Sequence, residues 1–161
     1  MITRALRPAD AKALLAIQAL AYPPSHHESW AVLGRRLQLW PQGCWVAEDG
    51  DRLLGYVLSH PWRQDRAVPL HGVLEALPET PDAYHLHDLA LHPDARGRGA
   101  AAQLVERVLQ AAAAAGLGTL TLVAVQGSQP FWERMGFTRR DAALAADYGA
   151  DAVAMRRTRA P

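Results

Sequence analysis

The apolar positions at the start of the chain predict a short strand followed by two helices. The strand covers residues 2–7 and ends at Pro8, whose fixed φ suits the first turn of a helix that runs to about Ala21. A segment with two prolines, residues 22–28, separates this helix from a second one over residues 29–39. We expect this polar segment to form the rim of a binding site.

The middle of the chain predicts a β-hairpin and then an irregular excursion. Two apolar runs, 44–48 and 53–59, are joined by residues 49–51, in which Asp-Gly supplies the positive φ that a tight hairpin turn needs. Residues 61–82 are rich in proline and charge and predict at most one helical turn, around residues 74–77. This excursion either folds over a site or merely connects two strands.

A βαβ unit is the clearest pattern in the second half of the chain. Strand 84–91 enters a loop with two glycines and two arginines, and the loop opens into an alanine-rich helix over residues 99–115. The apolar run 119–125 predicts a buried strand parallel to the first. With a short helix and strands at 137–140 and 150–156, the order describes a mixed α+β fold with helices on the faces of a sheet.

Size and composition narrow the possible functions. A length of 161 residues is typical of one domain, so we expect a single domain over residues 1–161. The formal charge of +1 argues against a nucleic-acid binder. The single cysteine, Cys44, makes an internal disulfide impossible and disfavours a cysteine-based metal site. No signal core and no apolar run of about 20 residues is present, so we expect a cytoplasmic protein with no membrane association and no metal.

The glycine and arginine loop predicts an anion site. The unpaired N–H groups of a helix N-terminus and the guanidinium groups of Arg96 and Arg98 converge just past the end of a strand. Two arginines inside a glycine loop at a helix start favour phosphate binding over a role as ordinary solvated charges. A phosphate or pyrophosphate would fit there.

Two motifs connect this loop with a known family. Residues 96–101, Arg-Gly-Arg-Gly-Ala-Ala, match a phosphate-loop pattern of Gln or Arg, two variable residues, Gly, one variable residue, and Gly or Ala. Downstream, an aromatic pair followed by Gly-Phe occurs in residues 131–137. Through these motifs the chain resembles the GNAT superfamily of acyl-CoA-dependent N-acyltransferases, most strongly from residue 84 to 140. The resemblance implies a mixed, mostly antiparallel sheet whose two central parallel strands splay apart, with helices on both faces.

The resemblance also implies acetyl-CoA as a co-substrate. Its pyrophosphate would sit on the loop amides, and its pantetheine arm would enter between the splayed strands and pair with Leu89 and Leu91. A bulge in the first strand would leave an amide near Leu89 free to polarise the thioester carbonyl. Val125 stands where relatives carry asparagine, so Gln126 or Ser128 is the expected substitute. The other residues expected to touch acetyl-CoA are Ala90, Arg96, Gly97, Arg98, Gly99, Ala100, Ala101, Ala102, Phe131 and Trp132.

Two histidines are candidates for the base that removes a proton from an attacking amine. His85 and His87 are two apart on one strand, so both side chains leave the same face. Histidine is neutral near pH 7, as such a base must be. The strand is similar to that of arylalkylamine N-acetyltransferases, whose paired histidines remove protons through water. The alternative is that the pair caps a polar sheet edge. Asp88 is predicted to point to the opposite face, in a structural role.

The proton donor and the acceptor contacts are less clearly marked. Trp132 stands where relatives carry a tyrosine that protonates the departing thiolate, which leaves Tyr148 or a water as the donor. Tyr22 and Glu28 are the acceptor candidates, because relatives place substrate contacts between the first two helices. Glu28 would attract an ammonium group, unless it is an exposed surface carboxylate.

The resulting function hypothesis is transfer of an acetyl group from acetyl-CoA to the primary amine of a small molecule, by direct attack in a ternary complex. Cys44 is far from the motifs in sequence, which disfavours an acyl-enzyme. Two alternatives stay open: a non-catalytic acyl-CoA sensor, and an acetyltransferase of a protein N-terminus or lysine. A homodimer is possible, since relatives often pair.

Overall fold

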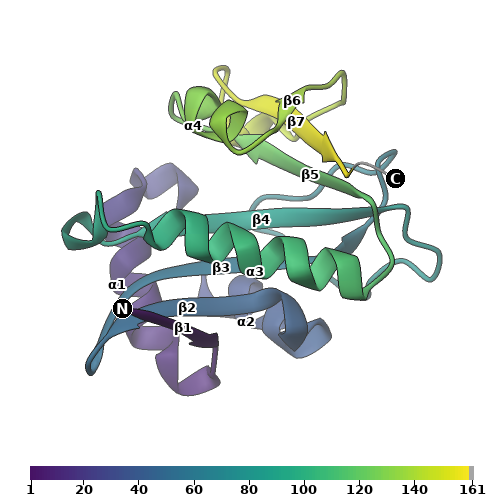
Figure 1. Ribbon diagram of the computed structural model, residues 1–161. Helices are drawn as coiled ribbons and strands as arrows, with labels where there is room; N and C mark the ends of the chain where they lie inside the picture. The colour runs from purple at the N-terminus through teal and green to yellow at the C-terminus, as the bar shows by residue number, and fades with distance from the viewer. Residues whose placement is uncertain (160–161) are drawn as a thin grey trace.

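The computed structural model describes residues 1–159 and consists of a seven-stranded sheet with helices against both faces (Figure 1). The strand order is β1-β2-β3-β4-β5-β7-β6. Among the described strands, β4 (Ala83–Leu91) and β5 (Thr119–Ala124) are the one parallel pair, and the other neighbours are antiparallel. This is the mixed, mostly antiparallel GNAT-like fold that the resemblance implied.

The remaining elements follow the predicted order. The other strands are β1 (Ile2–Ala5), β2 (Cys44–Asp49), β3 (Arg52–Trp62), β6 (Thr138–Arg139) and β7 (Val153–Thr158). The helices are α1 (Ala11–Ala21), α2 (Trp30–Leu39), α3 (Ala100–Ala114) and α4 (Gln129–Arg134). Single 3₁₀ turns are η1 (Pro8–Asp10), η2 (Pro24–His26), η3 (Pro41–Gly43), η4 (Pro93–Ala95) and η5 (Ala146–Tyr148).

Two apolar layers hold the helices to the sheet. On one face, α3 packs Leu104 and Val108 against Val57 of β3 and other side chains of the central strands. On the opposite face, α1 and α2 cover Tyr56 and Leu58 of β3. Alternate residues of β3 thus serve alternate layers, which is why almost the whole strand is buried.

Several element bounds differ from the predicted ones, while the irregular segment before β4 is as expected. β3 continues to Trp62, because residues 59–62 still pair with β4. Residues 74–77 form no helix; the segment between β3 and β4 is irregular throughout. β7 begins at Val153, a few residues later than expected, because η5 and a turn precede it. The hairpin of β2 and β3 is confirmed, with Gly50 at φ 60° in its turn.

Two general features bear on the classes of site. Within residues 1–159, no helix combines the length and the apolar character that crossing a membrane requires. In the same part of the chain, His, Cys, Asp and Glu side chains do not gather in groups of three or more that would hold a metal ion.

Candidate active site

The gap between β4 and β5 is the centre of the site. The two strands pair as far as Leu86 with Leu122, and from there they separate. On the other side of β4, the register with β3 shifts between Leu58 and Ser59, which leaves His87 as one extra residue. The bulge that the resemblance implied is therefore present, at the point where the strands splay.

The bulge also turns two consecutive side chains to the same face of the sheet. Leu86 and Leu89 both belong to the apolar layer beneath α3. Between them, His87 and Asp88 both hydrogen-bond to side chains of residues 22–28, on the opposite face. The prediction that Asp88 points away from the histidines is wrong, because the period-two rule does not hold across an inserted residue.

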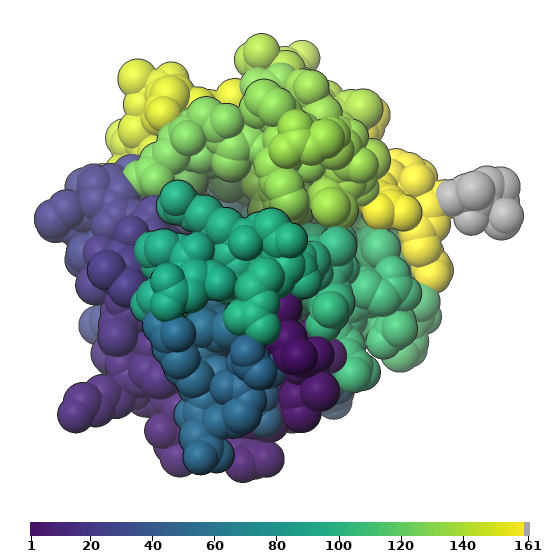
Figure 2. Space-filling view, turned by 60° about the vertical axis from the view of Figure 1, so that its left-hand side comes forward, coloured from purple at the N-terminus to yellow at the C-terminus, as the bar shows by residue number. Residues whose placement is uncertain are grey.

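A cavity of about 320 Å³ fills the gap. Figure 2 shows the molecule hollowed between the start of α3, in teal, and the segment around α4, in green. Most of the predicted site residues line this cavity: Tyr22, Glu28, His87, Leu89, Ala90, Leu91, Arg96, Ala101, Gln126, Ser128, Phe131, Trp132 and Tyr148. The other predicted site residues are outside this lining: His85, Gly97, Arg98, Gly99, Ala100 and Ala102.

From the loop before α3 and the first turn of that helix, Arg96 and Ala101 line the cavity. Gly97 and Gly99 have φ of 73° and 78°, a conformation that glycine adopts without strain. No side chain caps α3, so the N–H groups of its first turn are available to an anion. Arg96 lines the cavity, whereas Nη2 of Arg98 lies 2.7 Å from Oδ2 of Asp49 and is already paired. The two predicted arginines are therefore not equivalent.

The wall opposite the loop is aromatic. The rings of Phe131 and Trp132 meet edge to face at 4.8 Å, and Trp132 packs in the same way on Phe137 at 5.6 Å. Trp132 is buried and belongs to the core beneath α3. Its indole N–H does not ionise near neutral pH, so this wall holds no phenol that would protonate a thiolate.

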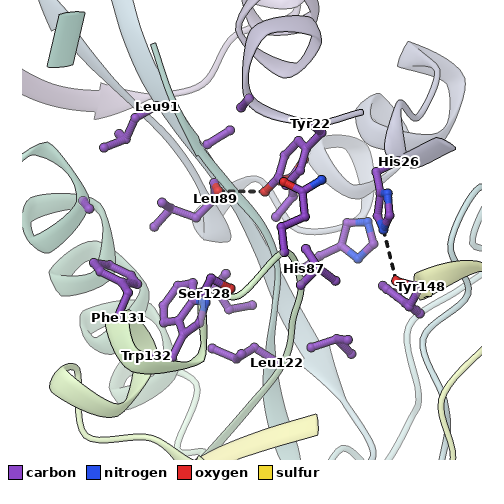
Figure 3. Close-up of a pocket in the computed structure, with 18 of the residues that line it drawn as sticks. Tyr22, His26, His87, Leu89, Leu91, Leu122, Ser128, Phe131, Trp132 and Tyr148 are labelled. Atoms are coloured by element: carbon purple, nitrogen blue, oxygen red, sulfur yellow. Dashed lines mark hydrogen bonds between the residues drawn. The ribbon is translucent and has the colours of Figure 1, made fainter. Parts of the chain in front are cut away.

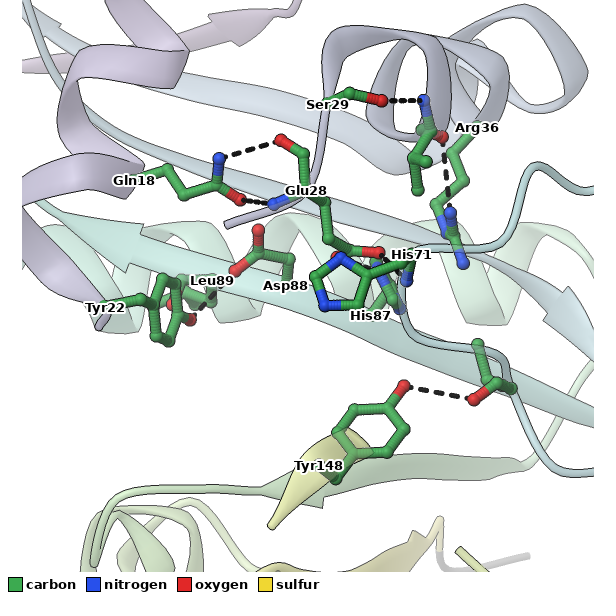
Figure 4. A network of polar contacts seen from close by, with 12 residues as sticks. Gln18, Tyr22, Glu28, Ser29, Arg36, His71, His87, Asp88, Leu89 and Tyr148 are labelled. Atoms are coloured by element: carbon green, nitrogen blue, oxygen red, sulfur yellow. Dashed lines mark hydrogen bonds and ion pairs between the residues drawn. The ribbon is translucent and has the colours of Figure 1, made fainter. Parts of the chain in front are cut away.

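At the other end of the cavity, Glu28 is buried, and both its backbone and its carboxylate are hydrogen-bonded. Its backbone exchanges two hydrogen bonds of 2.9 Å with the side chain of Gln18. Its Oε1 lies 2.7 Å from Nε2 of His87, and its Oε2 accepts from the backbone N–H of His71 at 3.0 Å (Figure 4). With 5% of its surface exposed, Glu28 is not a solvated surface carboxylate.

These contacts fix the charge of Glu28 and the tautomer of His87. Burial alone would raise the pKa of Glu28, but attraction by His87 and hydrogen bonds from His87 and the His71 amide outweigh it and lower the pKa. In a neutral His87, the ionised Glu28 accepts from an Nε2 that carries the proton, which leaves the lone pair on Nδ1. Within residues 1–159 that buried Nδ1 has no hydrogen-bond partner.

His85 is on the same face as His87 but lies behind the cavity wall. Its Nδ1 is 2.8 Å from Oγ1 of Thr121, and its ring centroid is 6.3 Å from that of His87. Burial, reinforced by the neighbouring His60 and His87, lowers its pKa well below the ordinary value. Burial also lowers the pKa of His60 to about 3. Of the predicted pair, only His87 reaches the cavity.

The Asp88 carboxyl, which the sequence assigned a structural role, also lines the cavity. Tyr56 donates to its Oδ2 at 2.7 Å, and the hydroxyl of Tyr22 is 2.8 Å from its Oδ1. The same hydroxyl lies 2.9 Å from the carbonyl oxygen of Leu89 (Figure 3). Burial raises the pKa of Asp88, although His87 and both tyrosines oppose the shift. No local sequence signal marks this group, because its position depends on the bulge.

Tyr148 closes the far side of the cavity. Its hydroxyl donates to the carbonyl oxygen of Val68 at 3.1 Å, and its own carbonyl oxygen is 3.1 Å from Nε2 of His26 (Figure 3). Burial raises the pKa of its phenol. The segment after α1, the excursion before β4 and the turn before β7 are thus tied together at this end.

Comparisons with known proteins agree with this geometry. The model of the Acetyltransferase (GNAT) family matches residues 11–137. No curated protein sequence matches the chain. Solved structures do: the GphF GNAT-like decarboxylase in complex with isobutyryl-CoA has a TM-score of 0.79 at 21% identity, covering 98% of this chain and 99% of that one.

Two further structures extend the range of relatives. Naa20 from Chaetomium thermophilum, in complex with a bisubstrate analogue, has a TM-score of 0.69 at 23% identity over 99% of this chain and 87% of that one. Rv2747 from Mycobacterium tuberculosis, in complex with CoA and NLQ, has a TM-score of 0.67 at 17% identity over 98% and 99%. At such identities the likeness shows the fold alone. The family match over most of the chain shows more: this protein belongs to the GNAT acetyltransferase family.

Proposed function

We propose that the protein transfers an acetyl group from acetyl-CoA to the primary amine of a small molecule, by direct attack in a ternary complex. The observation that carries this proposal is one continuous cavity, with Arg96 and Ala101 at one end and the pair of Glu28 and His87 at the other. The open edge of β4 lies between the two ends. A long donor and a short acceptor would meet at that edge.

The donor end suits an acyl-CoA. The first-turn amides of α3 and the guanidinium of Arg96 would hold the pyrophosphate. The peptide groups of Leu89 and Leu91, which face the gap left by β5, would pair with the amides of the pantetheine arm. A backbone amide freed by the bulge near Leu89 would then polarise the thioester carbonyl.

The acceptor end supplies a base. Because Glu28 holds the Nε2 proton of His87, the lone pair on Nδ1 accepts a proton from the incoming ammonium, directly or through a water. The carboxylate then stabilises the imidazolium that forms. His85, bonded to Thr121 behind the wall, has a lowered pKa and stays neutral.

The closed far end favours a small acceptor over a polypeptide. The contact between His26 and the Tyr148 carbonyl joins the segment after α1 to the turn before β7. A bound peptide would have to pass between these two segments, so it would need this bridge to open. A compact amine needs no such movement.

The test is release of thiol from acetyl-CoA in the presence of a varied set of small amines and short peptides. A thermal-shift measurement with CoA alone accompanies it. We expect stabilisation by CoA and turnover with at least one small amine. Stabilisation without turnover would favour a sensor, turnover with peptides alone would favour a protein acetyltransferase, and no stabilisation would refute acyl-CoA binding.

The base is tested with two matched variants, His87→Ala and His85→Ala. A general base contributes about 100-fold or more, so His87→Ala is expected to reduce kcat by at least that factor. His85→Ala is expected to reduce kcat less. Equal activity and equal pH profiles in both variants would rule out a histidine base.

A second candidate function is decarboxylation of an acyl-CoA that bears a β-carboxylate, and the absence of a phenol at Trp132 favours it. Loss of CO₂ leaves an enolate that takes up one proton, and the thioester stays intact, so no thiolate needs protonation. The GphF relative is described as a GNAT-like decarboxylase. Release of CO₂ from malonyl-CoA without release of thiol would support this function over amine acetylation.

A further inference from the structure

The Asp88 carboxyl lies between two tyrosine hydroxyls at the edge of the cavity. Tyr56 reaches Oδ2 from β3 at 2.7 Å, and Tyr22 reaches Oδ1 from the end of α1 at 2.8 Å. Tyr56 is fully buried, whereas Tyr22 lines the cavity and also lies 2.9 Å from the carbonyl oxygen of Leu89. Three short oxygen-to-oxygen contacts therefore form one connected group, of which Figure 4 shows Tyr22, Asp88 and Leu89.

The protons in this group can be counted. Each phenol carries one proton, and the one on Tyr56 goes to Oδ2 of Asp88. The proton on Tyr22 cannot serve Oδ1 of Asp88 and the Leu89 carbonyl fully at the same time. A carbonyl carries no proton, so if Tyr22 donates to the Leu89 carbonyl, the contact with Oδ1 needs a proton from Asp88, which is then a carboxylic acid that donates to Tyr22. The raised pKa of the buried Asp88 agrees with this count.

We propose that Tyr22 is the catalytic residue that protonates the departing CoA thiolate, and that Asp88 is a positioning residue that supplies Tyr22 with its replacement proton. This inference rests on the proposed function, because it places the thioester at the Leu89 edge of the cavity. The indole N–H of Trp132 does not ionise near neutral pH, and the Tyr148 hydroxyl is engaged with Val68. The Tyr22 hydroxyl is the phenol that lies beside Leu89.

The step balances in protons and electrons. As the carbon–sulfur bond breaks, the electron pair stays on sulfur, and sulfur takes the proton of Tyr22. The phenol oxygen takes the proton of Asp88 in turn, which leaves a carboxylate that accepts hydrogen bonds from Tyr22 and Tyr56. Of the two protons that the ammonium gives up, the one taken by His87 leaves to solvent and the other recharges Asp88. One proton is released overall.

The surrounding charges set the pH dependence. The ionisable groups around Asp88 come from every element that packs against it: Tyr22 after α1, Glu28 before α2, Arg36 from α2, Tyr56 from β3, His87 from β4 and Tyr148 from η5. The negative charge of Glu28 helps to hold a proton on Asp88, and His87 opposes it. Because the acid form of Asp88 is the active one, kcat is expected to fall as pH rises through its raised pKa.

The experiment compares Tyr22→Phe with Tyr84→Phe, a buried tyrosine outside the cavity that loses the same atom. Tyr22→Phe is expected to lower kcat about 100-fold while the KM for acetyl-CoA and the thermal stabilisation by CoA are kept. Tyr84→Phe is expected to keep the wild-type kcat. An unchanged kcat in Tyr22→Phe, or a loss that appears in Tyr148→Phe instead, overturns the proposal.

Asp88→Asn distinguishes a proton-supplying Asp88 from a purely structural one, because only the former changes the pH dependence of kcat. It is expected to remove the fall of kcat at high pH, and to remove the infrared carbonyl band of an un-ionised carboxylic acid in the wild-type protein. Absence of that band in the wild type overturns the proton count even if a variant fails to fold. Failure of the proposed function is seen separately, as a wild-type protein that releases no thiol with any amine.

Discussion

Arg96 and Arg98 show how much the neighbours of a residue decide its role. The two side chains are two positions apart in one loop and are chemically identical, yet only Arg96 lines the cavity. The Arg98 guanidinium lies 2.7 Å from Asp49, the last residue of β2. Binding a phosphate through Arg98 would first cost this pair, whereas Arg96 is free of ion pairs among residues 1–159.

Arg96→Ala is therefore expected to weaken the binding of CoA about tenfold or more, because a hydrogen bond to a charged group contributes about 1.5–3 kcal/mol. Arg98→Ala is the matched control, with a smaller loss. Titration calorimetry with CoA gives both dissociation constants. Equal losses in the two variants would contradict the distinction drawn between them, and an unchanged constant for Arg96→Ala would contradict its role at the pyrophosphate.

Glu28 leads to a prediction about stability and pH. Its pKa in the folded protein is lower than the ordinary value of 4.5, so its ionised form stabilises the fold at any pH above that value. This stabilisation is lost as the pH falls through the lowered pKa. Glu28→Gln is expected to lower the free energy of unfolding by about 1–3 kcal/mol at pH 7. At pH 3, the free energies of unfolding of the variant and the wild type are expected to differ by less. Urea unfolding at both pH values measures these free energies. A difference between variant and wild type that is as large at pH 3 as at pH 7 would contradict the role given to the contact between Glu28 and His87.

At the scale of the elements, the effect of the β4 bulge on Asp88 is what the sequence did not predict. Strand 84–91 was visible as an apolar run, and its alternation correctly placed His85 and His87 on one face. The position of Asp88 was not visible, because a bulge depends on how β3 pairs with β4 and leaves no mark in the composition of the strand. The polar group formed by Asp88, Tyr22 and Tyr56 was missed for the same reason.

Removal of the bulge residue tests whether the bulge causes the splay. Without His87, Asp88 would move to its place and still face α1, while Leu86 and Leu89 would still face α3, so the core keeps its pattern. A chain that lacks His87 is expected to unfold cooperatively but to lose its thermal stabilisation by CoA. His87→Ala, which keeps the bulge but also loses the contact with Glu28, is expected to retain that stabilisation. Retention by the deletion variant would show that the splay has another cause.

At the scale of the whole molecule, the order of elements followed from local patterns, but the closed end of the cavity did not. Strands, helices and the phosphate loop each depend on residues adjacent in sequence. The ties between His26 and Tyr148, and between Tyr148 and Val68, join segments that are far apart in the chain. None of these segments is regular enough to predict how the three come together.

Because β4 and β5 pair over only a short stretch, CoA binding is expected to stabilise some parts of the molecule more than others. Three residue pairs connect the sheet across this gap, from Tyr84 with Leu120 to Leu86 with Leu122. Beyond them, β5, α4, β6 and β7 are joined to the rest mainly through the apolar layer beneath α3. A ligand that fills the gap therefore adds contacts between the two sides of the molecule where only three residue pairs join them.

Amide hydrogen exchange should show this unevenness directly. Saturation with CoA stabilises every globally exchanging amide by RT ln(1 + [L]/Kd), about 2.7 kcal/mol at 100 times Kd. Above that uniform effect, we expect extra slowing in residues 89–91, 97–102 and 125–128, which open locally when the gap is empty. β1 and β2, on the far side of the sheet, are expected to show the uniform effect only. Equal slowing along the whole chain would mean that CoA does not bridge the gap, since a ligand bound elsewhere stabilises the fold without closing this particular opening.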